Sequence, residues 1–166
     1  MAQAETVRYL DIMIDSLEKK QRLYEQLLEK TDSQSICIKE KDYEGANWPQ
    51  FKVLMVEKDA IIETITGLDE GFEKAFARVK PELDRNKDAY SSQIKKLQEN
   101  IKKLTDTGVG ISAAEERNRQ DIERIMTTVR AGIGKARKNI RASNGYIASM
   151  YANNSVSGIS SIDSKK

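Results

Sequence analysis

The sequence predicts an all-α protein, folded as an elongated antiparallel three-helix bundle or coiled coil, and three observations support this prediction. Apolar residues recur three, four and seven positions apart over most of the chain, as on the buried face of an amphipathic helix. Residues that end helices cluster in two places, 45–49 and 105–112. Charged residues make up 33% of the 166 residues, above the usual ~25%, which indicates a thin core and a large solvated surface.

The first helix is predicted over residues 2–44. Its apolar stripe consists of Val7, Leu10, Ile14, Leu17, Tyr24 and Leu28. Between residues 31 and 35 the helix propensity falls, because Thr, Asp and Ser side chains compete for backbone hydrogen bonds. The stripe resumes at Ile36 and Tyr43. These residues favour a continuous helix, with a break near Asp32 as the alternative.

Residues 45–49 predict the first turn. Gly45 suits a left-handed helix end, Asn47 can cap the following helix, and Pro49 is tolerated in a first turn, where its missing amide hydrogen leaves no bond unmade. A change of chain direction is therefore expected here.

The second helix is predicted over residues 48–104. Its apolar positions are Phe51, Met55, Ile62, Ile65, Leu68, Phe72, Phe76, Val79, Leu83, Tyr90, Ile94, Leu97, Ile101 and Leu104. The stripe keeps its phase across Pro81, which predicts a kink rather than a new direction, although Pro inside a helix costs about 3 kcal/mol. A separate helix beginning near Pro81 is the alternative.

The third helix is predicted over residues 112–151, because Ser112 and Glu115 have the spacing of a capping box. Its stripe consists of Ile122, Met126, Val129, Ile133, Ala136, Ile140, Ile147 and Met150. After Tyr151 the composition changes to Asn, Ser and Gly. We therefore expect a helical bundle over 1–152 and a flexible tail over 153–166.

The composition argues against several classes of function. The chain has no histidine and one cysteine, Cys37, and no acidic pair is held by a turn that would position a substrate, so we expect neither catalysis nor a cofactor or metal. Adjacent acids such as Glu115 and Glu116 diverge on a helix and read as solvated charges. No run approaches the ~20 apolar residues of a membrane span, and the N-terminus lacks a signal-peptide pattern. A cytoplasmic protein without membrane insertion is expected.

The third helix is basic and rich in small residues. Between Arg124 and Ile162 there is no acid, and the cations are Arg124, Arg130, Lys135, Arg137, Lys138 and Arg141. The favoured interpretation is a solvated face that complements the acid-rich second helix. Nucleic-acid binding is a weaker alternative, because no aromatic stacking platform accompanies the charges. Binding to another protein is the other alternative for this basic segment.

Three glycines, Gly132, Gly134 and Gly145, each cost about 1 kcal/mol relative to Ala in an exposed helix. The third helix is therefore expected to open most readily. Two explanations stay open, namely close backbone packing and a loosely held helix that shifts to admit an amphipathic helix of a client.

Four segments, in this order and spacing, resemble the FlgN-type flagellar export chaperones, particularly forms from Gram-positive bacteria. They are Lys41-Asp42-Tyr43, Glu57-Lys58-Asp59 leading to Leu68-Asp69 and Phe72, Glu115-Glu116-Arg117-Asn118, and Ile162-Asp163-Ser164-Lys165-Lys166. The resemblance covers nearly the whole chain. It implies a cytoplasmic chaperone of the flagellar type III secretion system, which binds terminal helical segments of hook-associated proteins, prevents their premature assembly and delivers them to the export gate.

The resemblance also implies where binding occurs. In the family, the C-terminal part binds the client and contacts the gate and its ATPase components. Here that region carries Ile133, Ile140, Ile147 and Met150 as expected client contacts, and Tyr146 and Tyr151 as expected gate contacts. A self-associating coiled-coil scaffold is the alternative function, a basic-helix nucleic-acid binder is the third, and a homo-oligomer stays open.

Overall fold

The computed structural model describes residues 2–153 and consists of α1 (Gln3–Ile38), α2 (Trp48–Arg85), a short 3₁₀ helix η1 (Lys87–Tyr90) and α3 (Ser91–Asn153). Contacts divide the chain into two units, Met1–Ile122 and Glu123–Lys166. We call their described parts, 2–122 and 123–153, the bundle unit and the C-terminal unit. The predicted tail, 153–166, lies outside the described residues apart from Asn153, the last residue of α3.

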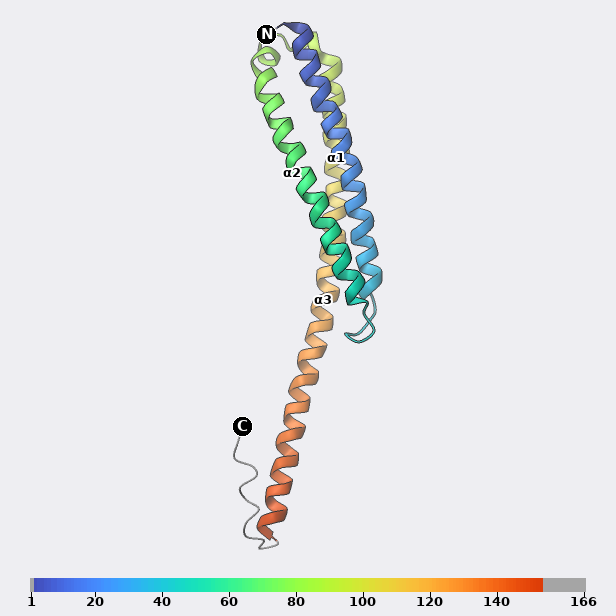
Figure 1. The fold of residues 1–166 in the computed structure, drawn as a ribbon, viewed down its shortest axis with the longest axis vertical. Helices are drawn as coiled ribbons and strands as arrows, with labels where there is room; N and C mark the ends of the chain where they lie inside the picture. Colours follow the sequence, from blue (N-terminus) through green and yellow to red (C-terminus); the bar gives the residue numbers. More distant parts are fainter. Residues whose placement is uncertain (1, 154–166) are drawn as a thin grey trace. The chain divides into compact units, whose positions relative to one another are not determined.

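The bundle unit is an up-down-up arrangement of α1, α2 and the first part of α3 (Figure 1). The ion pairs Lys20–Asp69 and Lys30–Glu57, each 2.7 Å from Nζ to a carboxylate oxygen, show that α2 runs antiparallel to α1. The contact between Gln21 and Thr107 and the contacts that Thr31 makes farther along α3 show that α3 runs parallel to α1. The all-α bundle predicted from the sequence is confirmed.

Helix α1 is continuous through residues 31–35, as favoured above, but it ends at Ile38 and not at residue 44. Lys39 is extended and Glu40 has a φ of 56°, so the left-handed residue is Glu40 and not Gly45. Gly45 serves another purpose. Its amide donates to Asp42 Oδ1 at 2.7 Å, and a Cβ at this position would lie only 2.9 Å from the same oxygen.

The start of α2 is as predicted. Asn47 caps the helix by accepting a hydrogen bond from the Gln50 amide at 3.3 Å, and Pro49 lies in the first turn. The Trp48 indole donates to the Tyr43 carbonyl at 2.9 Å and contacts the Phe51 ring edge-on. The turn is thus held by local hydrogen bonds whose donors and acceptors are all close in sequence.

The second break is not where the sequence placed it. Helix α2 continues through Pro81, as expected, but ends at Arg85, and η1 leads directly into α3. The expected helix over 48–104 is therefore wrong at its end, and the alternative of a new helix near Pro81 lies closer to the observed break. Asn86, with a φ of −139° and a ψ of 47°, turns the chain between the two elements.

Residues 105–112 lie inside α3, so the predicted helix start at Ser112 and its capping box are wrong. The hydroxyls of Thr105 and Thr107 donate to the carbonyls four residues earlier, at 2.9 and 3.1 Å, so they do not compete with the helix. A Cβ at Gly108 would lie 3.6 Å from the Tyr24 ring, which shows how closely α3 approaches α1 here. This packing offsets the intrinsic cost of glycine, about 1 kcal/mol.

The core lies along the facing stripes of the three helices. One cluster consists of Leu10, Met13, Ile14, Leu17, Ala75, Val79, Tyr90, Leu97 and Leu104, and a second of Leu27, Ile61 and Ile65. Several positions predicted to lie in the stripe of the second helix are instead about half exposed, namely Met55, Ile62, Phe76 and Ile101. They lie at the margin of the buried face and not at its centre.

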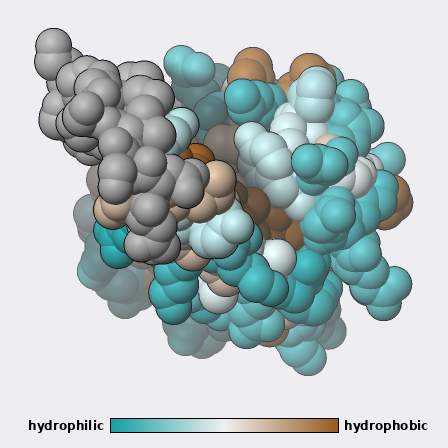
Figure 2. Space-filling model, turned by 90° about the horizontal axis from the view of Figure 1, so that it is seen from below, coloured by the Kyte–Doolittle hydropathy of each residue, from teal (hydrophilic) through white to brown (hydrophobic). Residues whose placement is uncertain are grey.

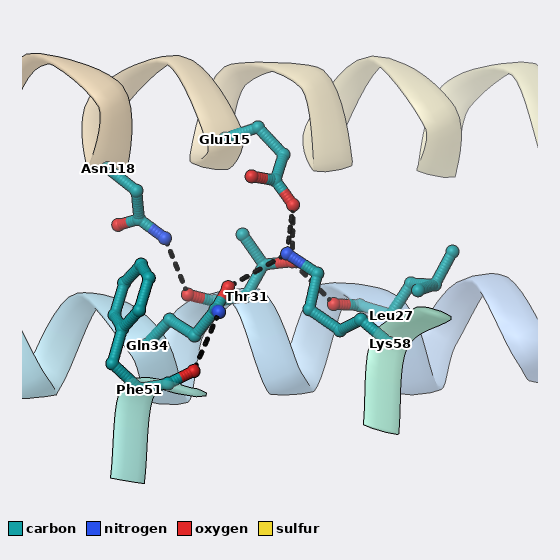
Figure 3. Close-up of polar contacts among 7 residues, drawn as sticks. All are labelled: Leu27, Thr31, Gln34, Phe51, Lys58, Glu115 and Asn118. Atoms are coloured by element: carbon teal, nitrogen blue, oxygen red, sulfur yellow. Dashed lines mark hydrogen bonds and ion pairs between the residues drawn. The ribbon is translucent and has the colours of Figure 1, made fainter. Parts of the chain in front are cut away.

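A polar network crosses the core near the C-terminal end of α1 and joins all three helices (Figure 3). Lys58 Nζ of α2 donates to Gln34 Oε1 of α1 at 2.8 Å and pairs with the Glu115 carboxylate of α3. The Thr31 hydroxyl donates to the Leu27 carbonyl, at 2.7 Å, with Glu115 Oε1 also within 3.2 Å.

The remaining bonds of this network are side chain to backbone. Gln34 Nε2 donates to the Phe51 carbonyl at 3.3 Å, and Asn118 Nδ2 donates to the Thr31 carbonyl at 3.0 Å. Lys58 and Asn118 are both buried. Because a helix that slips by one residue would strand these groups without partners, the network fixes the register of α3 against α1 and α2.

A second polar cluster closes the opposite end of the core. Glu82 accepts a hydrogen bond from the Tyr90 hydroxyl at 3.1 Å and pairs with Arg85. The hydrogen bond from Arg85 lowers the pKa of the Glu82 carboxyl, and burial raises the pKa of the Tyr90 phenol. The cluster is therefore built for an ionised carboxylate and a neutral phenol.

We expect the stability of the protein to fall in acid partly through Glu82. Its pKa is lower in the folded chain than in the unfolded chain, so its contribution is present above the ordinary glutamate pKa and is lost as the pH falls through the folded value. Glu82→Gln should therefore reduce the difference between the free energies of unfolding at neutral and acidic pH. Urea denaturation followed by circular dichroism measures that difference.

The matched control is Glu29→Gln, at an exposed position on α1, and it should keep the wild-type pH dependence. An equal reduction in both variants would contradict the role given to Glu82.

Candidate protein-binding surface

The C-terminal unit is a single stretch of α3 whose side chains become progressively exposed. Ile125 is buried, Met126 and Val129 are half-buried, and every residue from 131 to 152 is exposed. Each internal glycine of this stretch has open space around the position that a Cβ would occupy. Within the described residues, no other part of the chain packs closely against these glycines.

The four predicted client contacts lie on this exposed helix. Ile133, Ile140 and Ile147 are spaced by seven residues and share one helix face, and Met150 adjoins them one turn later. Their side chains are between 43% and 59% exposed. An apolar stripe at heptad spacing is the pattern that packs against another helix, so this face has the form of half of a coiled coil.

The two predicted gate contacts do not share a face. Both are exposed, but Tyr151 follows Ile147 by four residues and lies on the apolar stripe. Tyr146 lies five residues earlier than Tyr151, which places it about 140° away around the helix. One partner surface can therefore contact either of these rings more easily than it can contact both at once.

The cations of the C-terminal unit are arranged asymmetrically around the stripe. Arg130, Arg137 and Arg141 are spaced by seven and four residues and follow one edge of the stripe, whereas Lys135 and Lys138 lie on the back of the helix. The apolar face thus has one strongly cationic edge.

The bundle unit carries an apolar groove that the sequence analysis missed. It has a volume of about 600 Å³ and is lined by residues of all three helices, including Tyr24, Leu27, Ile62, Ile65, Val109 and Ile111. A second hollow of about 330 Å³ continues it and shares Tyr24, Thr105 and Gly108. The sequence does contain a signal for this groove. Apolar residues such as Ile62 on α2 and Val109 on α3 lie beside the buried stripe of their helix and not within it.

Other kinds of site find little support in the described residues. Among them, no group of three or more His, Cys, Asp or Glu side chains could hold a metal ion, and no helix combines the length and hydropathy of a membrane span. Figure 2 shows a surface that is mostly hydrophilic, with separate hydrophobic patches between the polar side chains.

The fold and its exposed surfaces define a class, an all-helical protein with apolar helix faces suited to binding other polypeptides. A family model described as FlgN protein matches residues 8–150. The chain belongs to the FlgN family, whose general role is that of a flagellar export chaperone. A search of the curated proteins and a search of the solved structures each found no match.

The match extends through the whole apolar stripe of the C-terminal unit and confirms the resemblance noted from the sequence. Two segments that carried that resemblance meet in the structure. Lys58 of the first contacts Glu115 of the second, and Asn118 of the second belongs to the same network (Figure 3). These residues therefore have a structural role in the bundle.

Proposed function

We propose that the protein is a cytoplasmic chaperone of flagellar type III secretion that binds terminal helical segments of hook-associated proteins. The observation that carries the proposal is the apolar stripe Ile133, Ile140, Ile147 and Met150, which lies exposed on a helix and inside the region that matches the FlgN family. An amphipathic client helix laid on this stripe would bury its own apolar face. The bound client would then be kept from premature assembly.

The same helix supports a moderate affinity, which release at the export gate requires. The three exposed glycines lower its helical stability, so binding must order a loosely held segment. Delivery to the gate and its ATPase components would place Tyr146 and Tyr151 at the gate. The two rings diverge around the helix, so the gate contact that lies beside the client stripe is assigned to Tyr151.

Deletion of residues 144–166 tests this function. The truncated protein loses Ile147, Met150 and both tyrosines, and we expect it to lose measurable binding to the hook-associated proteins of the same genome in calorimetry. Its bundle unit keeps every core residue named above, so circular dichroism should show cooperative unfolding at the wild-type denaturant concentration. Undiminished client binding by the truncated protein would refute the assignment.

A further inference from the structure

The face of α2 beside the groove carries its own apolar stripe at heptad spacing, and one member of that stripe, Ile62, lines the groove itself. Met55, Ile62 and Phe76 lie on one face of α2 and are between 41% and 49% exposed. Asp69 occupies the remaining heptad position and pairs with Lys20 across the second hollow. From Met55 to Phe76 this face is about 32 Å long at the rise of an α-helix.

One edge of this stripe is acidic. Asp59, Glu63, Glu70 and Glu73 follow the solvent side of the α2 stripe, all four are exposed, and none forms an ion pair within the described part of the chain. The α3 side of the groove is mixed in charge, with Lys102 and the paired Glu116. A helix lying in the groove therefore meets an acidic edge on its α2 side and both signs of charge on its α3 side.

The exposed face of the C-terminal unit has the complementary features. From Val129 to Met150 its apolar stripe is also about 32 Å long, and its isoleucines repeat with the same heptad spacing as the α2 stripe. Its charged edge, formed by Arg130, Arg137 and Arg141, is cationic where the edge of α2 is anionic. The two surfaces thus agree in length, in periodicity and in charge.

We propose that the groove of the bundle unit, together with the α2 stripe beside it, binds the α3 segment 129–150 of a second copy of this chain, and that two copies associate by exchanging these segments. A reciprocal exchange is a closed twofold arrangement, in which each groove is filled and each apolar stripe is buried. Arginine side chains of the guest helix lie against the carboxylates of α2, and its isoleucines enter the groove beside Ile62 and Val109.

Direct pairing of two C-terminal helices with each other is the less favourable arrangement. Between Arg124 and Ile162 the sequence contains no acid, so two such helices would face each other without any carboxylate to pair with Arg130 or Arg137. Like charges along a helix interface are unfavourable. Among the described residues, an acidic edge beside an exposed apolar stripe is found on α2 of the bundle unit.

The exchanged dimer goes beyond the proposed function and does not depend on it. It does, however, affect how a client would bind. If the same stripe binds the client, then the second copy and the client compete, and the exchanged dimer keeps the stripe covered until a client displaces it. A test without any client therefore separates the two proposals.

Charge reversal on the full-length chain tests the exchange. One variant carries Glu63→Lys and Glu70→Lys in the groove, and the other carries Arg130→Glu and Arg137→Glu in the guest segment. In a reciprocal exchange, each homodimer of a variant brings like charges together at both contacts, whereas a mixture of the two variants restores opposite charges at both. Sedimentation equilibrium over about a hundredfold range of concentration gives the mass of each sample.

We expect the wild-type mass to rise with concentration from 18.8 kDa towards twice that value, and less so at high salt, because exposed charge pairs are screened. Each variant alone should remain a monomer, and the equimolar mixture should regain the wild-type mass. A control with Asp11→Lys and Glu29→Lys, exposed on α1, should dimerise as the wild type does. Circular dichroism checks that every variant is folded.

Three results would overturn the inference. The first is a wild-type mass that stays monomeric at every concentration, as a helix folding back onto its own groove would produce. The second is a dimer that neither pair of reversals weakens. The third is a mixture of variants that remains monomeric although each variant is folded.

Discussion

Replacing Ile140 and Ile147 by aspartate is expected to reduce the affinity for a hook-associated client by about a hundredfold or more. Each isoleucine contributes roughly 1.5–3 kcal/mol when its side chain is buried against a partner helix, and aspartate would instead desolvate a charge there. The bundle unit contains neither position, so the free energy of unfolding should not change. Titration calorimetry measures the affinity, and urea denaturation measures the stability.

The matched control is Ala142→Asp combined with Ser149→Asp, which adds the same two charges on the opposite face of the helix. We expect this variant to bind the client within a few-fold of the wild type. If both variants lost affinity equally, the added charge and not the apolar stripe would be responsible. If neither lost affinity, the stripe would not be the client site.

Replacing Glu115 by leucine is expected to lower the free energy of unfolding by about 1–3 kcal/mol, because it leaves the buried Lys58 ammonium with one acceptor, Gln34 Oε1, in place of two. Glu115 itself is 47% exposed, so the cost comes from the buried lysine and not from the strength of a surface ion pair. Chemical denaturation followed by circular dichroism measures it.

Two further variants make this prediction specific. Lys58→Met combined with Glu115→Leu removes both charges and should recover most of the lost stability, since replacing a buried pair by apolar side chains is often close to neutral. Glu116→Leu removes an exposed carboxylate paired with Arg119 on the same helix, and should cost less than about 1 kcal/mol. Equal losses for Glu115→Leu and Glu116→Leu would show that the network does not stabilise the bundle.

The contacts of Glu115 also show why residues 105–112 form part of a helix despite their local signals for a break. Two threonines and two glycines in eight residues are a strong local signal for a break, and Ser112 with Glu115 is a good local signal for a helix start. In the folded chain Gly108 lies against Tyr24, and Glu115 is engaged by Lys58 of another helix. The free energy gained from these tertiary contacts exceeds the cost of the unfavourable local helix propensity.

The actual break, at Arg85 to Ser91, carries weaker local signals. Asn86 turns the chain there, but the buried Tyr90 and its hydrogen bond to Glu82 hold the turn in place. Such contacts join residues whose proximity arises only when the helices pack. A local pattern cannot reveal them.

Local patterns were sufficient for the features that a single helix determines. The all-helical class, the turn at 45–49 with its Asn47 cap, and the apolar stripe at 133–150 all follow from periodicity and capping chemistry, which act within a few residues. The family resemblance also required only the order of short segments along the chain.

Packing decided the remaining features. It placed the end of α2, carried α3 unbroken through Gly108 and Gly110, and gathered Thr31, Lys58 and Glu115 into one network. It also opened the groove beside Ile62, which looks like a core position in the sequence. These features depend on which helix faces which, and at what register, and that choice is made by contacts between residues far apart in the chain.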